Sequence, residues 1–110
     1  MPKDDELYLS HMLETARKAT SKTRGISRDA YNEDETLRLA LAHLVQILGE
    51  AARRVTSETQ AAQPNIAWRE IIGMRHKIVH DYMNLDEDVL WEVVTQDLPP
   101  LIEALEPIVS

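Results

Sequence analysis

The sequence predicts an all-α protein, an up-and-down bundle of four to five helices. Nearly every long segment repeats its apolar residues with the period of a helix, and no segment alternates apolar and polar residues as a half-buried strand does. The chain has 110 residues, which is long enough for a real but modest core. We therefore expect a single domain over residues 1–110.

Composition narrows the class of protein. The chain has no cysteine, so it can form neither a disulfide framework nor a thiolate metal site. Hydrophobic residues make up 44% of it and charged residues 28%, as is typical of globular domains rather than disordered ones. No apolar run approaches the ~18 residues of a membrane span, and no signal-peptide pattern opens the chain. We expect a soluble cytoplasmic protein with no membrane partner.

The net charge of −7 argues against binding nucleic acid, whose phosphates repel an acidic protein. The charge is uneven, however, because residues 86–110 hold seven acids and no lysine or arginine, while the first 85 residues are neutral overall. Residues 17–28 hold five basic residues and no acid. This basic segment is either a site for an anionic ligand or a solvated helix end and loop, and both interpretations stay open.

Two long helices are predicted first. One runs from residue 4 or 5 to residue 20, with acids in its first turn that suit the helix dipole. A loop and a short helical turn over residues 28–31 lead to the other. This second helix starts at a capping box of Asn32 with Glu35, ends near Val55, and has a face wide enough for a central helix. The expected core positions of the two helices are Leu9, Met12, Leu13, Ala16, Ala19, Leu37, Leu41, Leu44, Leu48, Ala52 and Val55.

The last helix is predicted to follow a break at residues 84–86, where Asp86 is a possible cap. Its apolar stripe continues past Pro99 and Pro100, which lack N–H groups, so the helix must kink or start again there. Asp97 is a candidate cap for this second start. The expected core positions are Leu90, Val94, Leu98, Leu101, Leu105 and Ile108.

A linker over residues 57–65 is predicted to precede the third helix, which carries the stretch MRHKIVHDYM. A helical template places Arg75 and Tyr82 of this stretch on the core-facing stripe. A guanidinium there is costly unless it is paired or opens onto a site. Arg75 therefore bonds an acid or a helix end inside the bundle, extends its stem to solvent, or marks a functional site.

Other residues of the third helix also suggest a site. Gly73 in a helix interior costs ~1 kcal/mol relative to alanine, which suggests that another group approaches the backbone closely. His76 and His80 lie four residues apart and could ligate a metal, but no third ligand lies near them in the sequence. We expect no metal and no cofactor.

Arg75 and His80 lie about 140° apart around a straight helix. They can meet on one small group only if the helix distorts near His80 or if a second chain contributes a residue. A two-fold dimer would bring two copies of this helix together. We favour a composite site across a dimer axis.

Four stretches of the sequence resemble one known family. RHKIVHDY, residues 75–82, fits the R-x4-H-x-Y pattern of HepT-like toxins in the HEPN superfamily of small all-helical ribonucleases. IAWREIIGMR resembles the W-x2-I-x-G-x-R block of the family, ILGEAARRV its Gly-Glu-containing central helix, and VLWEVVTQDLP its last-helix signature. The resemblance spans roughly residues 37–105. His76 departs from the pattern, because the residue after the arginine is often asparagine.

This resemblance implies a HEPN-like homodimer with Arg75 and His80 at the dimer cleft, and metal-independent cleavage of an RNA substrate. It also implies a partner, a minimal nucleotidyltransferase antitoxin of the MNT type, which adenylylates the motif tyrosine and makes Tyr82 the modification target. Without a metal, the 2′-OH of RNA can attack the adjacent phosphate. We expect His80 to move a proton in this reaction and Arg75 to stabilise the phosphorane.

Several assignments have alternatives. His76 binds phosphate, takes the second proton role, or caps polar contacts at the dimer surface, and Tyr82 is otherwise a half-buried aromatic that closes the helix. Asp81 is a solvent-facing acid or the orienter of a histidine, while His11 and His43 are expected to be structural, with His43 at the edge of the core. The alternative function is a non-catalytic helical partner or substrate-binding subunit of a nucleotidyltransferase, which the net charge of −7 fits better. A plain dimerisation domain would leave the polar residues unexplained.

Overall fold

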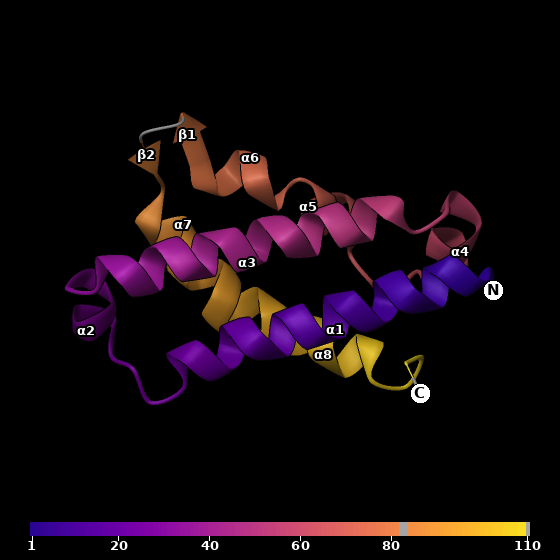
Figure 1. Cartoon of the computed structure of the whole chain (residues 1–110), viewed down its shortest axis with the longest axis horizontal. Helices are drawn as coiled ribbons and strands as arrows, with labels where there is room; N and C mark the ends of the chain where they lie inside the picture. The colour runs from indigo at the N-terminus through magenta and orange to yellow at the C-terminus, as the bar shows by residue number, and fades with distance from the viewer. Residues whose placement is uncertain (82–83, 110) are drawn as a thin grey trace.

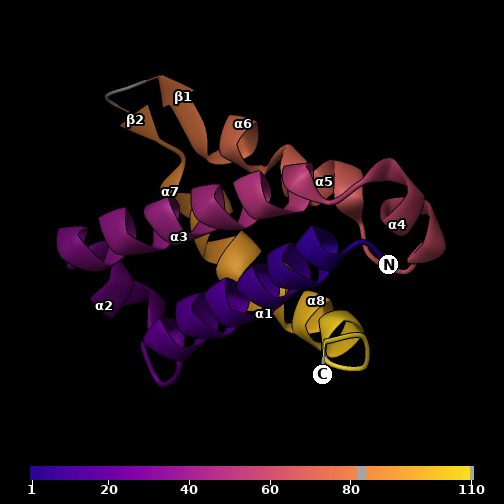
Figure 2. The same cartoon turned by 45° about the vertical axis from the view of Figure 1, so that its right-hand side comes forward.

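Helices dominate the computed structural model, which describes residues 1–81 and 84–109 (Figure 1). This confirms the all-α class, with one small two-stranded sheet in addition. The long helices α1 (Lys3–Thr23) and α3 (Glu35–Arg54) run antiparallel and pack against each other, and α8 (Leu98–Leu105) packs along α1 (Figures 1 and 2). No helix in the described residues is long and apolar enough to cross a membrane.

α1 runs to Thr23, beyond its predicted end at Thr20. The Thr23 hydroxyl donates to the Thr20 carbonyl at 3.0 Å, a side-chain hydrogen bond back onto the last turn of the helix. Gly25, at φ +74°, then turns the chain in the left-handed conformation that favours glycine. The predicted helical turn is confirmed as α2 (Arg28–Asn32).

The N-terminus of α3 is capped by Asp34, whose Oδ1 accepts from the Leu37 N–H at 2.9 Å. The predicted capping box of Asn32 with Glu35 is therefore wrong. Asn32 is the last residue of α2, and its carbonyl accepts from Arg38 Nη1 at 2.6 Å, so it terminates one helix instead of starting the next.

α3 ends next to the predicted Val55, but it is not buried on all sides. Leu39 is 56% exposed and Ile47 is 39% exposed, so one face of the helix lies on the surface. The expected core positions Leu37 and Leu44 are only half-buried. α3 therefore covers the core from one side instead of running through its centre. Its buried residues are Leu41, Ala42, Val45, Leu48, Gly49, Ala51 and Ala52.

The predicted linker contains a short helix, α4 (Ser57–Ala62), so the linker prediction is wrong. A buried carboxylate holds this helix in place. Asp5 is 1% exposed and accepts from the Thr56 N–H at 3.1 Å and from the hydroxyls of Thr56 and Thr59 at 2.6 Å each. Burial raises the pKa of this carboxyl, but the hydrogen bonds outweigh burial, and the net shift of its pKa is downward. These bonds fasten the start of α1 to α4.

The segment that carries the sequence motif is not one helix. α5 (Trp68–Ile72) ends at Gly73, and α6 (Met74–Ile78) is followed by two strands. β1 (Val79–Asp81) and β2 (Asn84–Leu85) pair antiparallel. The predicted continuous helix through residue 82 is therefore wrong.

Two local features end these helices. Gly73 sits between α5 and α6 at φ −84° and ψ −1°, and a Cβ on it would lie 3.2 Å from the Arg69 carbonyl of the preceding turn. At the end of α6, the Asp86 N–H donates to the Ile78 carbonyl at 2.7 Å. In a longer helix this carbonyl would accept from the N–H four residues further along the chain. Here it accepts from Asp86 instead, so the helix ends and the chain turns back.

The C-terminal segment consists of α7 (Glu87–Glu92), a π-helical turn η1 (Val93–Asp97), and α8. The second helix start predicted at Pro99 and Pro100 is confirmed, since both lie in the first turn of α8, where their missing N–H groups matter least. The predicted cap is wrong, because the Asp97 side chain makes no capping hydrogen bond. The wider π turn brings the chain into α8 instead.

The core lies between α1, α3 and the C-terminal segment. The close backbone approach expected at Gly73 comes from the Arg69 carbonyl of the preceding turn, and a second one occurs at Gly49, where a Cβ would lie 3.1 Å from the Ile71 carbonyl of α5. This contact lets α5 pack directly on α3. Predicted core positions that are confirmed as buried are Leu9, Met12, Leu13, Ala16, Ala19, Leu41, Leu48, Ala52, Val55, Leu90, Val94, Leu98, Leu101 and Leu105, while Ile108 is half-buried.

Candidate active site

Arg75 lies on the exposed surface of α6 and not in the core. The predicted core-facing position is wrong, because the break at Gly73 shifts the buried face of the segment. The side chains that face the core are Ile71, Met74 and Ile78. Arg75 therefore needs no buried counter-charge, and its guanidinium is accessible from outside the bundle.

The guanidinium of Arg75 contacts α3. Its Nε donates to Oε1 of Gln46 at 3.2 Å, and Nε2 of Gln46 donates to the Ala42 carbonyl at 3.2 Å, which orients the amide. Gln46 is the hydrogen-bond partner that the described residues offer Arg75. A guanidinium has five N–H donors, so a bond through Nε fixes its plane and leaves the two Nη groups for a bidentate anion. Only tertiary packing brings these residues together, and the sequence pattern did not indicate Gln46.

His80 lies on β1 at an irregularity of the strand pair. Val79 pairs with Leu85 and Asp81 pairs with Asn84, so His80 is an extra residue on β1 with no counterpart on β2. Such a bulge bends the strand and redirects a side chain. The His80 side chain is 62% exposed, and its Nε2 lies 3.3 Å from Oδ2 of Asp86.

Each carboxylate oxygen of Asp86 makes a different contact. Its Oδ1 accepts from the Val89 N–H at 3.0 Å, which confirms the predicted cap of α7. Its Oδ2 faces the imidazole of His80, a contact that the sequence analysis missed. On the continuous helix predicted through His80, an acid six residues later would point in another direction. A hairpin prediction for residues 79–85 would have revealed the pair.

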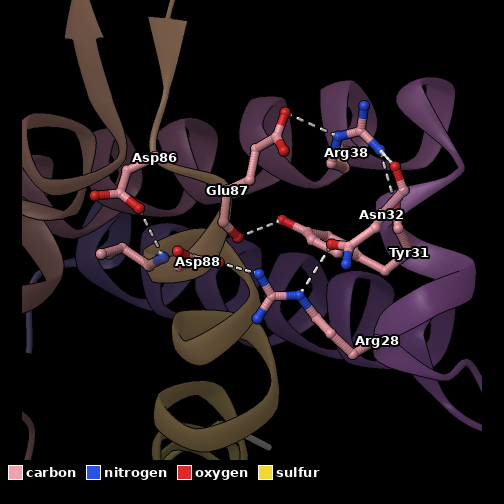
Figure 3. Close-up of polar contacts among 8 residues, drawn as sticks. Arg28, Tyr31, Asn32, Arg38, Asp86, Glu87 and Asp88 are labelled. Atoms are coloured by element: carbon pink, nitrogen blue, oxygen red, sulfur yellow. Dashed lines mark hydrogen bonds and ion pairs between the residues drawn. The ribbon is translucent and has the colours of Figure 1, made fainter.

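A polar network holds the start of α7 against α2 and α3 (Figure 3). The buried hydroxyl of Tyr31 donates to the Glu87 carbonyl at 2.7 Å, and the Tyr31 ring lies 4.8 Å from the Trp91 ring, centroid to centroid. Burial, with a contribution from the nearby charge of Glu87, raises the pKa of Tyr31 to about 12. Nε of Arg38 lies 3.1 Å from Oε1 of Glu87.

Arg28 completes the network. It pairs with Asp88, and its Nε donates to Oδ1 of Asn32 at 3.0 Å (Figure 3). The two residues after Asp86 are thus each paired with an arginine from α2 or α3. This fixes the first turn of α7, and with it the carboxylate that faces His80.

His76 is the next predicted site residue along the chain from Arg75. His76 is exposed on α6, and since α6 ends before His80, the two imidazoles do not share a helical face. The geometry behind the two-histidine metal pattern is therefore absent. No group of three or more potential metal ligands occurs in the part of the chain that the structure describes. Tyr82 and the side chain of Asp81 lie outside the described residues.

A surface depression of about 280 Å³ lies between α3, β2 and the start of α7, and neither Arg75 nor His80 lines it. Gln46, which holds Arg75, lines it together with Leu85 of β2 and Glu87 of α7. Figures 1 and 2 show α6 and the strand pair along the same side of α3. The chain distorts before His80, which is one of the two ways in which the sequence allowed the groups to meet. No hydrogen bond or ion pair between described atoms joins Arg75 and His80, so their convergence stays a prediction.

The remaining histidines were expected to be structural. His43 lines the same depression and is exposed, so its predicted place at the edge of the core is wrong. Its helical position falls on the outer face of α3 with Leu39 and Gln46, and not on the stripe of Leu41 and Leu48. His11 is also exposed, on α1.

The mostly helical architecture is the one expected of a HEPN-like protein. The family described as HepT-like, ribonuclease HepT-like, matches residues 12–108, and the chain belongs to this family. The expected family and HEPN-like fold are thereby confirmed.

Two relatives cover nearly the whole chain. The chain is 31% identical over 101 residues to "Probable ribonuclease HepT" of Thermococcus cleftensis, an alignment that spans 92% of each protein. It is 28% identical over 104 residues to "Putative RNase MJ1380" of Methanocaldococcus jannaschii, which spans 94% of this chain and 95% of that protein. No solved structure is significantly similar to the chain.

Proposed function

We propose that this protein is the toxin of a toxin–antitoxin pair, a metal-independent endoribonuclease that acts as a homodimer. One observation carries the proposal. In a chain of the HepT-like family, the motif arginine and the motif imidazole are both exposed, and each is contacted by a polar side chain, Arg75 by Gln46 and His80 by Asp86. A domain that served only as a scaffold would have no use for Arg75 and His80 in these positions.

The chemistry needs a proton acceptor and a fixed cation. The 2′-oxygen of the substrate attacks the adjacent phosphorus, its proton passes to His80, and the P–O5′ bond breaks. Arg75 binds two non-bridging oxygens of the phosphorane through its Nη groups, where charge accumulates in the transition state. His76 supplies the proton that the leaving 5′-oxygen needs. The products are a 2′,3′-cyclic phosphate and a 5′-hydroxyl.

The surface of α3 supports the dimer. Leu39 and Ile47 are large apolar side chains exposed to solvent on the helix that also carries Gln46. A second copy that covers them would bring another Arg75 and His80 towards the depression. Sedimentation of the wild type as a dimer and of Leu39→Asp as a monomer would support this arrangement, and a wild type that sediments as a monomer at the concentration of the cleavage assay would contradict it.

The partner is a nucleotidyltransferase antitoxin, and Tyr82 is its target. The tyrosine oxygen attacks the α-phosphorus of ATP, pyrophosphate leaves, and AMP remains on the side chain. Tyr82 follows His80 by two residues, so the added group brings bulk and negative charge to the place where RNA phosphate must bind. An intact-mass increment of AMP that is absent from Tyr82→Phe would locate the modification.

The test uses purified, unmodified protein and end-labelled RNA in EDTA. Arg75→Ala and His80→Ala should each abolish cleavage while circular dichroism and thermal melting stay those of the wild type. His11→Ala, an exposed histidine on α1, is the matched control and should cleave normally. Inert wild-type protein, or cleavage that survives in His80→Ala, would contradict the proposal.

A second function is favoured by charge. The net charge of −7 suits a non-catalytic partner or substrate-binding subunit of a nucleotidyltransferase better than an RNA-binding protein. Wild-type protein that binds the nucleotidyltransferase and never cleaves RNA, in its unmodified state, would establish this alternative.

A further inference from the structure

The contact between His80 and Asp86 has a direction. Asp86 Oδ2 lies 3.3 Å from Nε2 of the imidazole, and not from Nδ1. In this structure the contact is a close approach of the two groups and not a hydrogen bond. An ionised carboxylate accepts hydrogen bonds and cannot donate one, so a hydrogen bond formed across this contact needs an N–H on Nε2. In a neutral imidazole only one nitrogen carries a hydrogen, so such a bond would leave Nδ1 as the nitrogen that can receive a proton.

Asp86 is held firmly enough to make this selection. Its Oδ1 caps α7 through the Val89 N–H at 3.0 Å, and its own N–H is bonded to the Ile78 carbonyl at 2.7 Å. These two bonds fix the carboxylate plane, so Oδ2 is presented to the ribbon that carries His80. The distance of 3.3 Å between Nε2 of His80 and Oδ2 of Asp86 is long for a hydrogen bond. Catalytic hydrogen bonds are often long without substrate and shorten when it binds.

The arginines near the start of α7 are paired with other acids and not with Oδ2 of Asp86. The two arginines in the network above, Arg28 and Arg38, are paired with Asp88 and Glu87 (Figure 3). Among the described residues His80 is the cationic or titratable side chain that faces Asp86. The bulge in β1 turns His80 towards it.

We propose that Asp86 is the positioning residue of His80: it holds the imidazole as the Nε2–H tautomer and thereby makes Nδ1 the atom that takes the 2′-OH proton of RNA. The inference deepens the proposed function and rests on it. Asp86 touches neither substrate nor reacting atoms and acts through the ring of His80.

Asp86→Asn tests the proposal because it keeps the cap and reverses the direction of the contact. Asparagine caps a helix about as well as aspartate, so Oδ1 stays on Val89. The amide nitrogen then faces Nε2 of His80 and donates to it, which moves the ring hydrogen to Nδ1 and removes the proton acceptor. The same change in a Ser-His-Asp triad costs about 10⁴-fold in kcat, and for this more exposed pair we expect a loss of at least ~10²-fold with KM unchanged.

The second measurement does not depend on activity. Long-range ¹H–¹⁵N spectra of the neutral imidazole should show His80 as the Nε2–H tautomer in the wild type and as the Nδ1–H tautomer in Asp86→Asn. The matched control is Asp34→Asn, because Asp34 caps α3 in the same way, with Oδ1 at 2.9 Å from the Leu37 N–H. This control should keep the wild-type kcat and the wild-type tautomer.

The outcomes separate the two claims. If Asp86→Asn cleaves RNA within about 3-fold of the wild type, or if His80 keeps its Nε2–H tautomer in that variant, Asp86 does not position the base. If wild-type protein cleaves no RNA, the proposed function fails, and the spectra still decide whether Asp86 sets the tautomer. Equal unfolding free energies of wild type and Asp86→Asn would show that a loss of kcat is not a loss of fold.

Discussion

Replacing Tyr31 by phenylalanine should loosen the attachment of α2 to α7 without opening a cavity. The side chain is fully buried, and its hydroxyl donates to the Glu87 carbonyl at 2.7 Å. The ring and its contact with Trp91 remain in the variant, so the loss is that of one hydrogen bond, about 1 kcal/mol. For a chain of 110 residues this corresponds to a fall in Tm of about 4 °C.

Urea unfolding at neutral pH measures this loss. Tyr8→Phe is the matched control, since Tyr8 is half-buried and its hydroxyl makes no hydrogen bond to a described residue. The control should keep the wild-type free energy of unfolding. A change in Tyr31→Phe of less than ~0.3 kcal/mol would refute the argument, because the hydroxyl would then contribute nothing net to the junction.

Alkaline pH gives an independent check on the same residue. The pKa of Tyr31 is raised from 10.0 to about 12 in the folded protein, so the folded state holds this proton more tightly than the unfolded state does. The associated stability is fully present below pH 10 and is lost as the pH rises through 10 to about 12. The free energy of unfolding of the wild type should therefore fall more steeply above pH 10 than that of Tyr31→Phe.

Three further predictions follow from contacts described above. The pKa of Asp5 is lowered in the folded state, so its contribution is present above pH 3.8 and is lost as the pH falls below 3.8; Asp5→Ala should remove that part of the acid-induced loss of stability. Gly49→Ala places a Cβ 3.1 Å from the Ile71 carbonyl and should destabilise by about 1–3 kcal/mol in urea, because backbone on the facing helix cannot yield easily. Gln46→Leu removes the oriented partner of Arg75 and should lower kcat/KM for RNA about tenfold with unchanged Tm, whereas an unchanged kcat/KM would show that Gln46 does not hold the guanidinium.

Helical periodicity predicted the helices that bury a regular apolar stripe. α1, α3 and α8 carry such stripes, and nearly all their expected core residues are buried. α4 was missed because its residues SETQAA have no stripe, and the helix depends on a tertiary contact with Asp5 from the far end of the sequence. Local pattern cannot report an anchor that lies 51 residues away.

The candidate site was predicted by residue identity and not by geometry. The helical template ran from Trp68 to Val79 with Arg75 as its one polar position, so it carried the helix past its real end at Ile78. Apolar periodicity carries no information about the hydrogen bond that the Asp86 N–H donates to the Ile78 carbonyl, and this bond ends the helix. That turn places His80 on a strand, and the break at Gly73 accounts for the exposed position of Arg75.

His80 is the extra residue of the β1–β2 pair, so the direction of its imidazole depends on the number of residues in the two strands as well as on their identity. Side chains on a strand alternate between faces, so removing one residue from Val79–Asp81, or adding one to Asn84–Leu85, would turn His80 to the opposite face from Asp86. The helices on either side would keep their packing. Of these two changes, only the insertion in Asn84–Leu85 would leave every residue of the sequence motif, and its spacing, as they are.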